Sequence, residues 1–297
     1  MNGSYRNEAF IDVDQILGRE FDPVTLEYTD REVILYALGV GAGRDPLDPK
    51  ELAFVYEGSP GGLKVLPTFA VTFPGMMALQ VMSMPGIRFN PMLLLHGEQY
   101  LEIMKPLPAA ARITSRGKIS QVYDKGKAAL ILVDMHSEDA SGDPVAFNRV
   151  SLFVRDLGGF GGERGPSNRD LNEAPERHPD AVWEERVPKN QALLYRLTGD
   201  RNPLHADPSM AAIGGFERPI LHGLCTFGFA ARAVLKKFAG NDPDRIKSVS
   251  ARFARHFFPG ETLVTEMWQQ SDQEILFRAK TLERDEFVLT NARVELR

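Results

Sequence analysis

The sequence has little cysteine, no excess of basic residues and no long apolar run. Its 297 residues include a single cysteine, Cys225, which excludes an intrachain disulfide and a zinc site built from cysteines. With 35 basic and 40 acidic residues the net charge is −5, whereas nucleic-acid binders normally carry a basic surface. No apolar run approaches the roughly 20 residues of a membrane-spanning helix. We therefore expect neither nucleic-acid nor membrane partners.

The two ends of the given sequence show no targeting signal of the common types. MNGSYRNEAF lacks a basic segment followed by an apolar stretch, so a secretory signal is not expected. VELR differs from peroxisomal tripeptides of the S-K-L type. Together with the single cysteine, which suits a reducing compartment, these ends predict a cytoplasmic location.

A segment rich in glycine, proline and charge divides the chain into halves of similar size. Residues 156–180 read DLGGFGGERGPSNRDLNEAPERHPD, a composition typical of a linker. A chain of 297 residues also exceeds the usual size of a single core. We therefore predict an N-terminal unit at residues 1–155 and a C-terminal unit at residues 181–297.

The two halves repeat the same patterns in the same order. VILYALGVGAGRDPLDP (33–49) and ALLYRLTGDRNPLHADP (192–208) share an apolar-apolar-Tyr-x-Leu opening and a Pro-Leu turn, if a two-residue gap is allowed. HGEQYLEIMKPLPAAARI (96–113) resembles VSARFARHFFPGETLVT (249–265), and further alternating apolar segments follow both. Each half is therefore predicted to end in an antiparallel meander.

A long helix is predicted only in the second half. In LHGLCTFGFAARAVLKKF (221–238) apolar residues recur at helical spacing and predict one buried face, and Lys236 and Lys237 suit the C-terminal end of the helix dipole. The matching stretch FAVTFPGMMALQVMSMPG (69–86) is interrupted by two prolines and a glycine. A helix wrapped by an antiparallel sheet is the hotdog arrangement, so we predict an α+β double hotdog with a reduced N-terminal half.

The turn DRNPLH at residues 200–205 contains groups that can transfer protons. Asp200 and His205 could hold one water between a carboxylate and an imidazole, and the amide of Asn202 can orient it. Asp and Asn before proline are also ordinary turn formers, and a lone histidine is more often structural. A metal held by His205, Asp207 and His222 would match no standard spacing, so no metal is expected.

The matching turn of the first half lacks this pair. Gly41 or Gly43 replaces the aspartate there, Asp45 replaces the asparagine and Asp48 replaces the histidine. We therefore expect chemistry only in the second half. The first half is expected to supply a wall of the pocket.

Two residues beside the turn are further candidates for this site. Gly223 falls at the predicted start of the helix, so its N–H is one of the unpaired donors of the first turn and can bind a negatively charged oxygen. Tyr195 could donate a hydrogen bond in the pocket, but packing is the alternative, and its counterpart Tyr36 in the half without the pair favours packing.

The stretch YRLTGDRNPLHADPSMAAIGGFERPILHGLCTFG (195–228) resembles the hydratase 2 motif of the MaoC-like dehydratase family, in its D-x-N-P-x-H core and its I-L-H-G-L-C-T continuation. LYALGVGAG and ELAFVYEG resemble the degenerate N-terminal hotdog of two-domain members. The resemblance implies a hydro-lyase that reversibly adds water to trans-2-enoyl-CoA and forms an (R)-3-hydroxyacyl-CoA. It implies Asp200 and His205 as the acid-base pair, Asn202 beside them and the Gly223 N–H as oxyanion donor. It also implies an acyl-CoA substrate, no separate cofactor and a homodimer.

Binding of such a substrate adds two expectations. Arg252 and Arg255 are candidates for the phosphates of coenzyme A, although a solvated strand edge is the alternative. The methionine-rich stretch from Phe69 to Met92 is a candidate lining for the acyl tail, with ordinary core as the alternative.

Two other functions remain open from the sequence. A hotdog acyl-CoA thioesterase would direct water at the thioester carbonyl, and a non-catalytic acyl-CoA binding protein would bind without turnover. The paired Asp and His fit hydration better than either.

Overall fold

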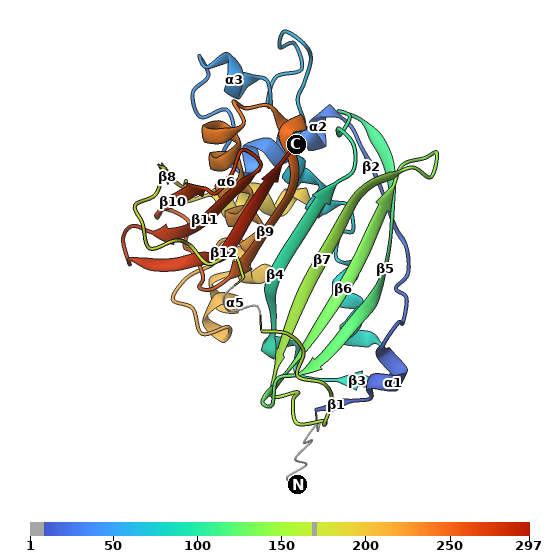
Figure 1. Cartoon of the computed structure of the whole chain (residues 1–297). Helices are drawn as coiled ribbons and strands as arrows, with labels where there is room; N and C mark the ends of the chain where they lie inside the picture. Colours follow the sequence, from blue (N-terminus) through green and yellow to red (C-terminus); the bar gives the residue numbers. More distant parts are fainter. Residues whose placement is uncertain (1–8, 168–170) are drawn as a thin grey trace.

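The structure is built around one antiparallel sheet of ten strands with the helices on one face (Figure 1). It is a computed structural model that describes residues 9–167 and 171–297. The strand order is β2-β5-β6-β7-β4-β9-β12-β11-β10-β8. The elements of the first half are β1 (Phe10–Ile11), α1 (Val13–Ile16), β2 (Val24–Tyr28), α2 (Asp30–Gly39), α3 (Pro49–Leu52), η1 (Pro67–Thr72), η2 (Met77–Ser83), β3 (Ile87–Arg88), η3 (Pro91–Leu93), β4 (Leu94–Ile103), β5 (Ala111–Asp124), β6 (Ala128–Glu138) and β7 (Pro144–Arg155). Those of the second half are β8 (Ala181–Arg186), α4 (Gln191–Tyr195), η4 (Arg196–Thr198), η5 (Pro203–His205), α5 (Pro208–Ile213), α6 (Gly223–Phe238), η6 (Pro243–Arg245), β9 (Ile246–Phe253), β10 (Thr262–Gln269), β11 (Glu274–Thr281) and β12 (Glu286–Leu296).

The sheet order shows the internal repeat. Read outward from the centre, β4-β7-β6-β5-β2 of the first half mirrors β9-β12-β11-β10-β8 of the second. The halves join where β4 pairs with β9, from Glu98 opposite Arg252 to Glu102 opposite Ser248. This order confirms the predicted double hotdog and both meanders. In residues 156–180 the described part contains no helix or strand, and the division into units at 1–155 and 181–297 stays a prediction.

The long helix of the second half, α6, lies at the centre of the molecule. It begins at Gly223, and every residue from Cys225 to Leu235 is buried. It packs on β9, β10 and β12 and also on η1 of the first half. The sequence predicted one buried face, but the helix is buried on all sides through this segment because the first half covers the side that would otherwise face solvent.

From residue 9 to residue 155 the first half has no helix as long as α6, as its prolines led us to expect. The short 3₁₀ segments η1 and η2 occupy this part of the chain. Met77, Val81 and Met84 belong to a second core cluster under β5, β6 and β7, whereas Met82 and Met92 are exposed. Part of the methionine-rich stretch is therefore ordinary core, and its role in lining an acyl-tail pocket stays a prediction.

The two Pro-Leu turns have the same local structure. In each, the side chain before proline accepts a hydrogen bond from the N–H of the leucine two residues on, at 2.9 Å for Asp45 and 3.1 Å for Asn202. Asp48 then caps α3 as Asp207 caps α5. By this role Asp48 corresponds to Asp207, which corrects the pairing of Asp48 with His205. The first half therefore has no residue at the position of His205.

No helix in the described residues is long and apolar enough to cross a membrane.

Candidate active site

Three side chains of the second half converge between the DRNPLH turn and the start of α6. One carboxylate oxygen of Asp200 and one ring nitrogen each of His205 and His222 lie within 4.8 Å of one another. The two imidazole rings are stacked, with centroids 3.7 Å apart and planes inclined by 27°. His205 and His222 are buried and Asp200 is half-buried, so the cluster combines a carboxylate with imidazoles that are shielded from bulk water.

Backbone carbonyls fix which ring nitrogens carry protons. Because a carbonyl oxygen only accepts, His205 donates its Nδ1–H to the oxygen of Ile220 at 2.9 Å, and His222 donates its Nε2–H to the oxygen of Asp200 at 3.1 Å. A neutral His205 therefore keeps a free lone pair at Nε2. His222 thereby braces the backbone of Asp200.

Burial keeps these histidines neutral. It lowers the pKa of His205 below its ordinary 6.5, although the Ile220 carbonyl and the charge of Asp200 oppose the shift. Burial and the neighbouring His205 lower the pKa of His222 to about 4. At neutral pH the lone pair of His205 is therefore available to accept a proton.

The remaining polar residues of the turn hold its shape. The N–H of Asn202 donates to Oδ1 of Asp200 at 3.0 Å, while its side-chain oxygen caps η5. Asn202 is exposed, so its amide NH₂ can reach a bound ligand. Asp207 caps α5 and is outside the cluster of Asp200, His205 and His222.

Gly223 lies where the sequence placed it, as the first residue of α6. It is exposed, and among the described residues no hydrogen-bond acceptor is found for its N–H. A Cβ atom here would lie 3.1 Å from two ring atoms of Phe253, so the side chain of β9 packs closely over this glycine. The helix dipole adds partial positive charge at the same point.

Tyr195 is buried beside the cluster. Its ring centroid lies 5.0 Å from that of His222 and 6.1 Å from that of Tyr36 in the first half. Burial raises its pKa, so the phenol stays protonated. Tyr195 and Tyr36 thus form an aromatic contact between the halves, which is the packing role considered from the sequence. A hydrogen bond from Tyr195 to substrate stays a prediction.

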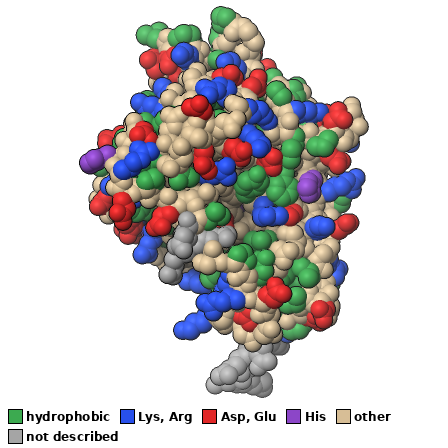
Figure 2. Space-filling model, in the orientation of Figure 1, with side chains coloured by type: hydrophobic (Ala, Val, Ile, Leu, Met, Phe, Trp, Pro, Cys, Tyr) green, Lys and Arg blue, Asp and Glu red, His purple; other side chains and the backbone are tan. Residues whose placement is uncertain are grey.

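The structure does not bring the two predicted phosphate ligands to the cluster. Arg252 lies on the face of β9 opposite Phe253, because neighbouring residues of a strand point to opposite sides. It lines a groove of about 280 Å³ together with Arg149 and Arg293. Figure 2 looks onto this outer face of the sheet, where basic and acidic side chains are mixed. Arg255 is exposed beyond the end of β9, and the roles of both predicted arginines stay predictions.

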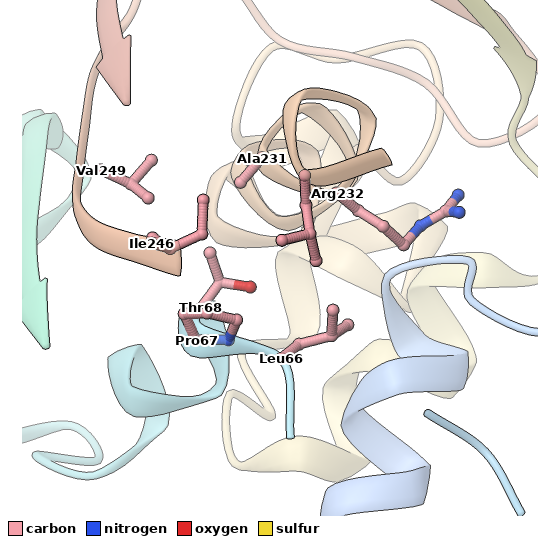
Figure 3. Close-up of a pocket in the computed structure, with 8 residues that line it drawn as sticks. Leu66, Pro67, Thr68, Ala231, Arg232, Ile246 and Val249 are labelled. Atoms are coloured by element: carbon pink, nitrogen blue, oxygen red, sulfur yellow. The ribbon is translucent and has the colours of Figure 1, made fainter. Parts of the chain in front are cut away.

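A small cavity lies between η1, α6 and β9 (Figure 3). Its volume is about 10 Å³, which is room for one water at most. Thr68 and Val249 line it, whereas the guanidinium of Arg232 points away from it. It is therefore not a substrate site.

Sequence reasoning missed one residue that the fold brings near this cluster. His96 is the third residue of β4 in the first half, and the charge of Asp200 opposes the lowering of its pKa. No spacing pattern connects residues so far apart in the chain. The only signal was the internal repeat, which aligns the strand of His96 with β9.

We expect the protein to lose stability as the pH falls from about 6.5 to about 4. Burial lowers the pKa of His96 and His222 to about 4 and also lowers that of His205, so the unfolded chain binds more protons in this window. At about 1.4 kcal/mol for each pKa unit, the total loss is of the order of a few kcal/mol. Urea denaturation at pH 7.5, 6, 5 and 4 measures it, and a free energy of unfolding that stays constant over this range would contradict it.

Comparisons with known proteins agree with this fold. A protein of Dictyostelium discoideum named probable enoyl-CoA hydratase 2 is 46% identical over 95% of this chain and 95% of its own length. The peroxisomal enoyl-CoA hydratase 2 of Arabidopsis thaliana is 43% identical over 93% of each chain. The crystal structure of a MaoC-like dehydratase from Phytophthora capsici superposes with a TM-score of 0.85 at 36% identity, over 97% of this chain and 99% of the other.

The names of these relatives correct the expected cytoplasmic location. The Arabidopsis relative is named peroxisomal, and so is a mouse multifunctional enzyme that is 45% identical over 94% of this chain and 38% of its own length. They point to the peroxisome in place of the cytoplasm. The cysteine count was a weak argument, because it excludes only compartments whose proteins depend on disulfides.

Two family matches cover most of the chain. Residues 26–156 match the MFE-2 hydratase 2 N-terminal domain, and residues 170–291 match the MaoC-like domain. The second match contains Asp200, His205 and Gly223. The chain therefore belongs to the MaoC-like dehydratase family, as a two-domain member of the hydratase 2 type.

Proposed function

We propose that this chain is an (R)-specific 2-enoyl-CoA hydratase, a hydro-lyase that adds water reversibly to trans-2-enoyl-CoA. The observation that supports it most is the convergence of the Asp200 carboxylate and the imidazole of His205 within 4.8 Å, beside the free N–H of Gly223. Relatives named enoyl-CoA hydratase 2 match this chain over nearly its whole length.

The geometry supports the following order of events. A water lies between the Asp200 carboxylate and Nε2 of the neutral His205 imidazole, because both groups accept a hydrogen bond and a water can donate one to each. His205 takes one proton from this water, and the oxygen forms a bond to Cβ of the enoyl group. The proton is then delivered to Cα, so one water is added across the double bond and the pair returns to its starting state. Asn202, exposed at the turn, orients the water.

The negative charge that develops during addition lies on the thioester oxygen. The N–H of Gly223 points out of the first turn of α6 and can donate to that oxygen. This proposal needs no metal or redox cofactor, since the chemistry is proton transfer and coenzyme A arrives with the substrate. We also propose a homodimer, which light scattering of the purified chain would test.

Crotonyl-CoA and trans-2-decenoyl-CoA are expected to lose their enoyl-thioester ultraviolet absorbance in the presence of the wild-type protein. Chiral chromatography should then give the (R)-3-hydroxyacyl-CoA. Free coenzyme A as the product would indicate thioester hydrolysis. Tight binding of both substrates without turnover would indicate an acyl-CoA binding protein, and either result would overturn the proposal.

A further inference from the structure

The cluster of Asp200, His205 and His222 offers three hydrogen-bond acceptors. Nδ1 of His205 and Nε2 of His222 already donate to backbone carbonyls, so each neutral ring keeps a lone pair on its other nitrogen. An ionised carboxylate only accepts. A water between these side chains has two hydrogens and can therefore satisfy only two of the three acceptors.

The acceptor that is left over can be identified. Nδ1 of His222 is shielded from solvent and has no hydrogen-bond partner in the part of the chain that the structure describes. His222 is 1% exposed, so bulk water does not reach this atom either. Turning the ring to pair Nδ1 would break the bond from Nε2 to the backbone of Asp200. A buried lone pair without a donor costs stability, and a bound ligand is one reason to keep it.

The hydrogen bonds of the two imidazoles are those of metal-binding histidines. A histidine that binds a metal through one nitrogen almost always donates the other N–H to a carboxylate, a carbonyl or a water, which fixes the tautomer and the ring. His205 donates in this way to Ile220 at 2.9 Å, and His222 to Asp200 at 3.1 Å. Both rings are therefore held with one lone pair free.

The spacing of the cluster suits a small divalent cation. One ligand atom from each of the three side chains lies within 4.8 Å of the others. Around zinc, with bonds of about 2.0–2.2 Å, such atoms lie about 3.3 Å apart, so no pair has to close by more than about 1.5 Å. Rotation of the half-buried Asp200 side chain can supply part of this movement. The carboxylate considered for a metal from the sequence was that of Asp207, but the fold brings Asp200 to the two histidines instead.

The types of ligand decide which cation fits. Two imidazoles and one carboxylate, with a fourth position left for water, form a common zinc set, whereas Mg²⁺ and Ca²⁺ prefer ligands that are all oxygen. We propose that Asp200, His205 and His222 bind one Zn²⁺ or a similar transition-metal ion, and that this ion inhibits hydration.

The inhibition rests on the proposed hydratase function, whereas the binding does not. A zinc ion on Nε2 of His205 occupies the lone pair that would take the proton from water. It also binds the carboxylate that would hold this water. The metal-bound enzyme should therefore have no activity until the ion is removed.

Binding is tested first on the metal-free wild type. Equilibrium dialysis should give about one Zn²⁺ per chain at micromolar free zinc, and Co²⁺ should give the intense visible absorption of a four-coordinate ion with nitrogen and oxygen ligands. Millimolar Mg²⁺ should not displace either ion. Absence of zinc binding to the wild type overturns the inference with no mutation needed.

Variants then assign the ligands. Asp200→Asn, His205→Gln and His222→Gln should each weaken Zn²⁺ binding by about 100-fold or more, as judged against the 10–100-fold cost of losing only an outer contact. Asp207→Asn and His136→Gln are the matched controls and should bind zinc as the wild type does, since Asp207 lies outside the cluster and His136 is exposed on β6. Circular dichroism should show that each variant is folded. Binding that survives in the three cluster variants but is lost in His136→Gln or His178→Gln would show a surface site and overturn the inference.

Activity separates the inference from the proposed function. Zinc should abolish hydration of crotonyl-CoA by the wild type with an inhibition constant close to its dissociation constant, and EDTA should restore the full rate. A protein that binds zinc at this cluster and still hydrates crotonyl-CoA would overturn the inhibition. Failure of the metal-free wild type to hydrate enoyl-CoA substrates would instead refute the proposed function, and the zinc site would be judged by dialysis alone.

Discussion

Asp200→Asn is expected to lower kcat/KM for trans-2-enoyl-CoA by roughly 10³-fold, which lies within the usual range for loss of a general acid-base group. The amide keeps the shape and can still accept from the N–H of Asn202, which binds Oδ1 at 3.0 Å. It removes the negative charge that holds the water and stabilises the imidazolium of His205. Loss of enoyl-thioester absorbance measures the rate, and equilibrium binding of the saturated acyl-CoA should change little.

Asp207→Asn is the matched control for this substitution. Asp207 is exposed, lies two residues beyond this turn and caps α5, a role that asparagine fills equally well. We expect its kcat/KM to stay within about twofold of wild type, since it makes no contact with the cluster. Equal losses in the two variants would show that the turn needs negative charge in general and would contradict the assignment of Asp200.

Arg232→Met is expected to lower the free energy of unfolding by about 3–5 kcal/mol, the usual cost of leaving a buried charge unpaired. Arg232 is 4% exposed and lies on α6. It donates to the oxygen of Val40 at 3.1 Å and to Glu51 at 3.3 Å, both in the first half, and to Glu185 of β8 in the second. Glu51 is 3% exposed, and Lys236 at 3.0 Å would offset only part of its charge. Urea denaturation measures the loss.

Two control variants show whether the loss of unfolding free energy in Arg232→Met comes from the buried charge network. Arg112→Met removes an exposed ion pair with Glu27, whose side chains are 64% and 70% exposed, and should cost less than about 1 kcal/mol. Neutralising the network by adding Glu51→Gln and Glu185→Gln to Arg232→Met should restore part of the stability, because no buried charge is then left unpaired by the missing arginine. A loss of less than about 1 kcal/mol in Arg232→Met would show that the network does not hold the two halves together.

Much of the fold could be predicted because the internal repeat is visible as residue patterns within short segments of the sequence. The alternating strands, the lack of a long helix where prolines interrupt residues 69–86 and the start of α6 at Gly223 each depend on residues close in sequence. The burial of α6 on all sides could not be read this way. It depends on η1 of the first half, whose contact with α6 no helical period encodes.

The site divides in the same manner. The DRNPLH motif placed Asp200, His205 and Asn202 on one turn, and the structure keeps them there. Alternation tells which residues of β9 share a side but not which side carries the site, so the position of Arg252 on the side opposite Phe253 could not be predicted. The stacking of His222 on His205 could not be predicted either, because it required the chain to fold back from residue 222 to residue 205.

The sequence by itself determined the double hotdog, the loss of the acid-base pair from the first half and the groups available for proton transfer. Each of these rests on residue identity and short-range spacing, which local sterics and hydrogen bonding convert directly into turns, strands and helix starts. Only the tertiary structure decided which lone pairs are free, which histidines stay neutral, and that His96 of the first half packs against Phe253, which lies over Gly223. Those properties arise from burial and from contacts between distant segments, and they exist only after the two halves have paired β4 with β9.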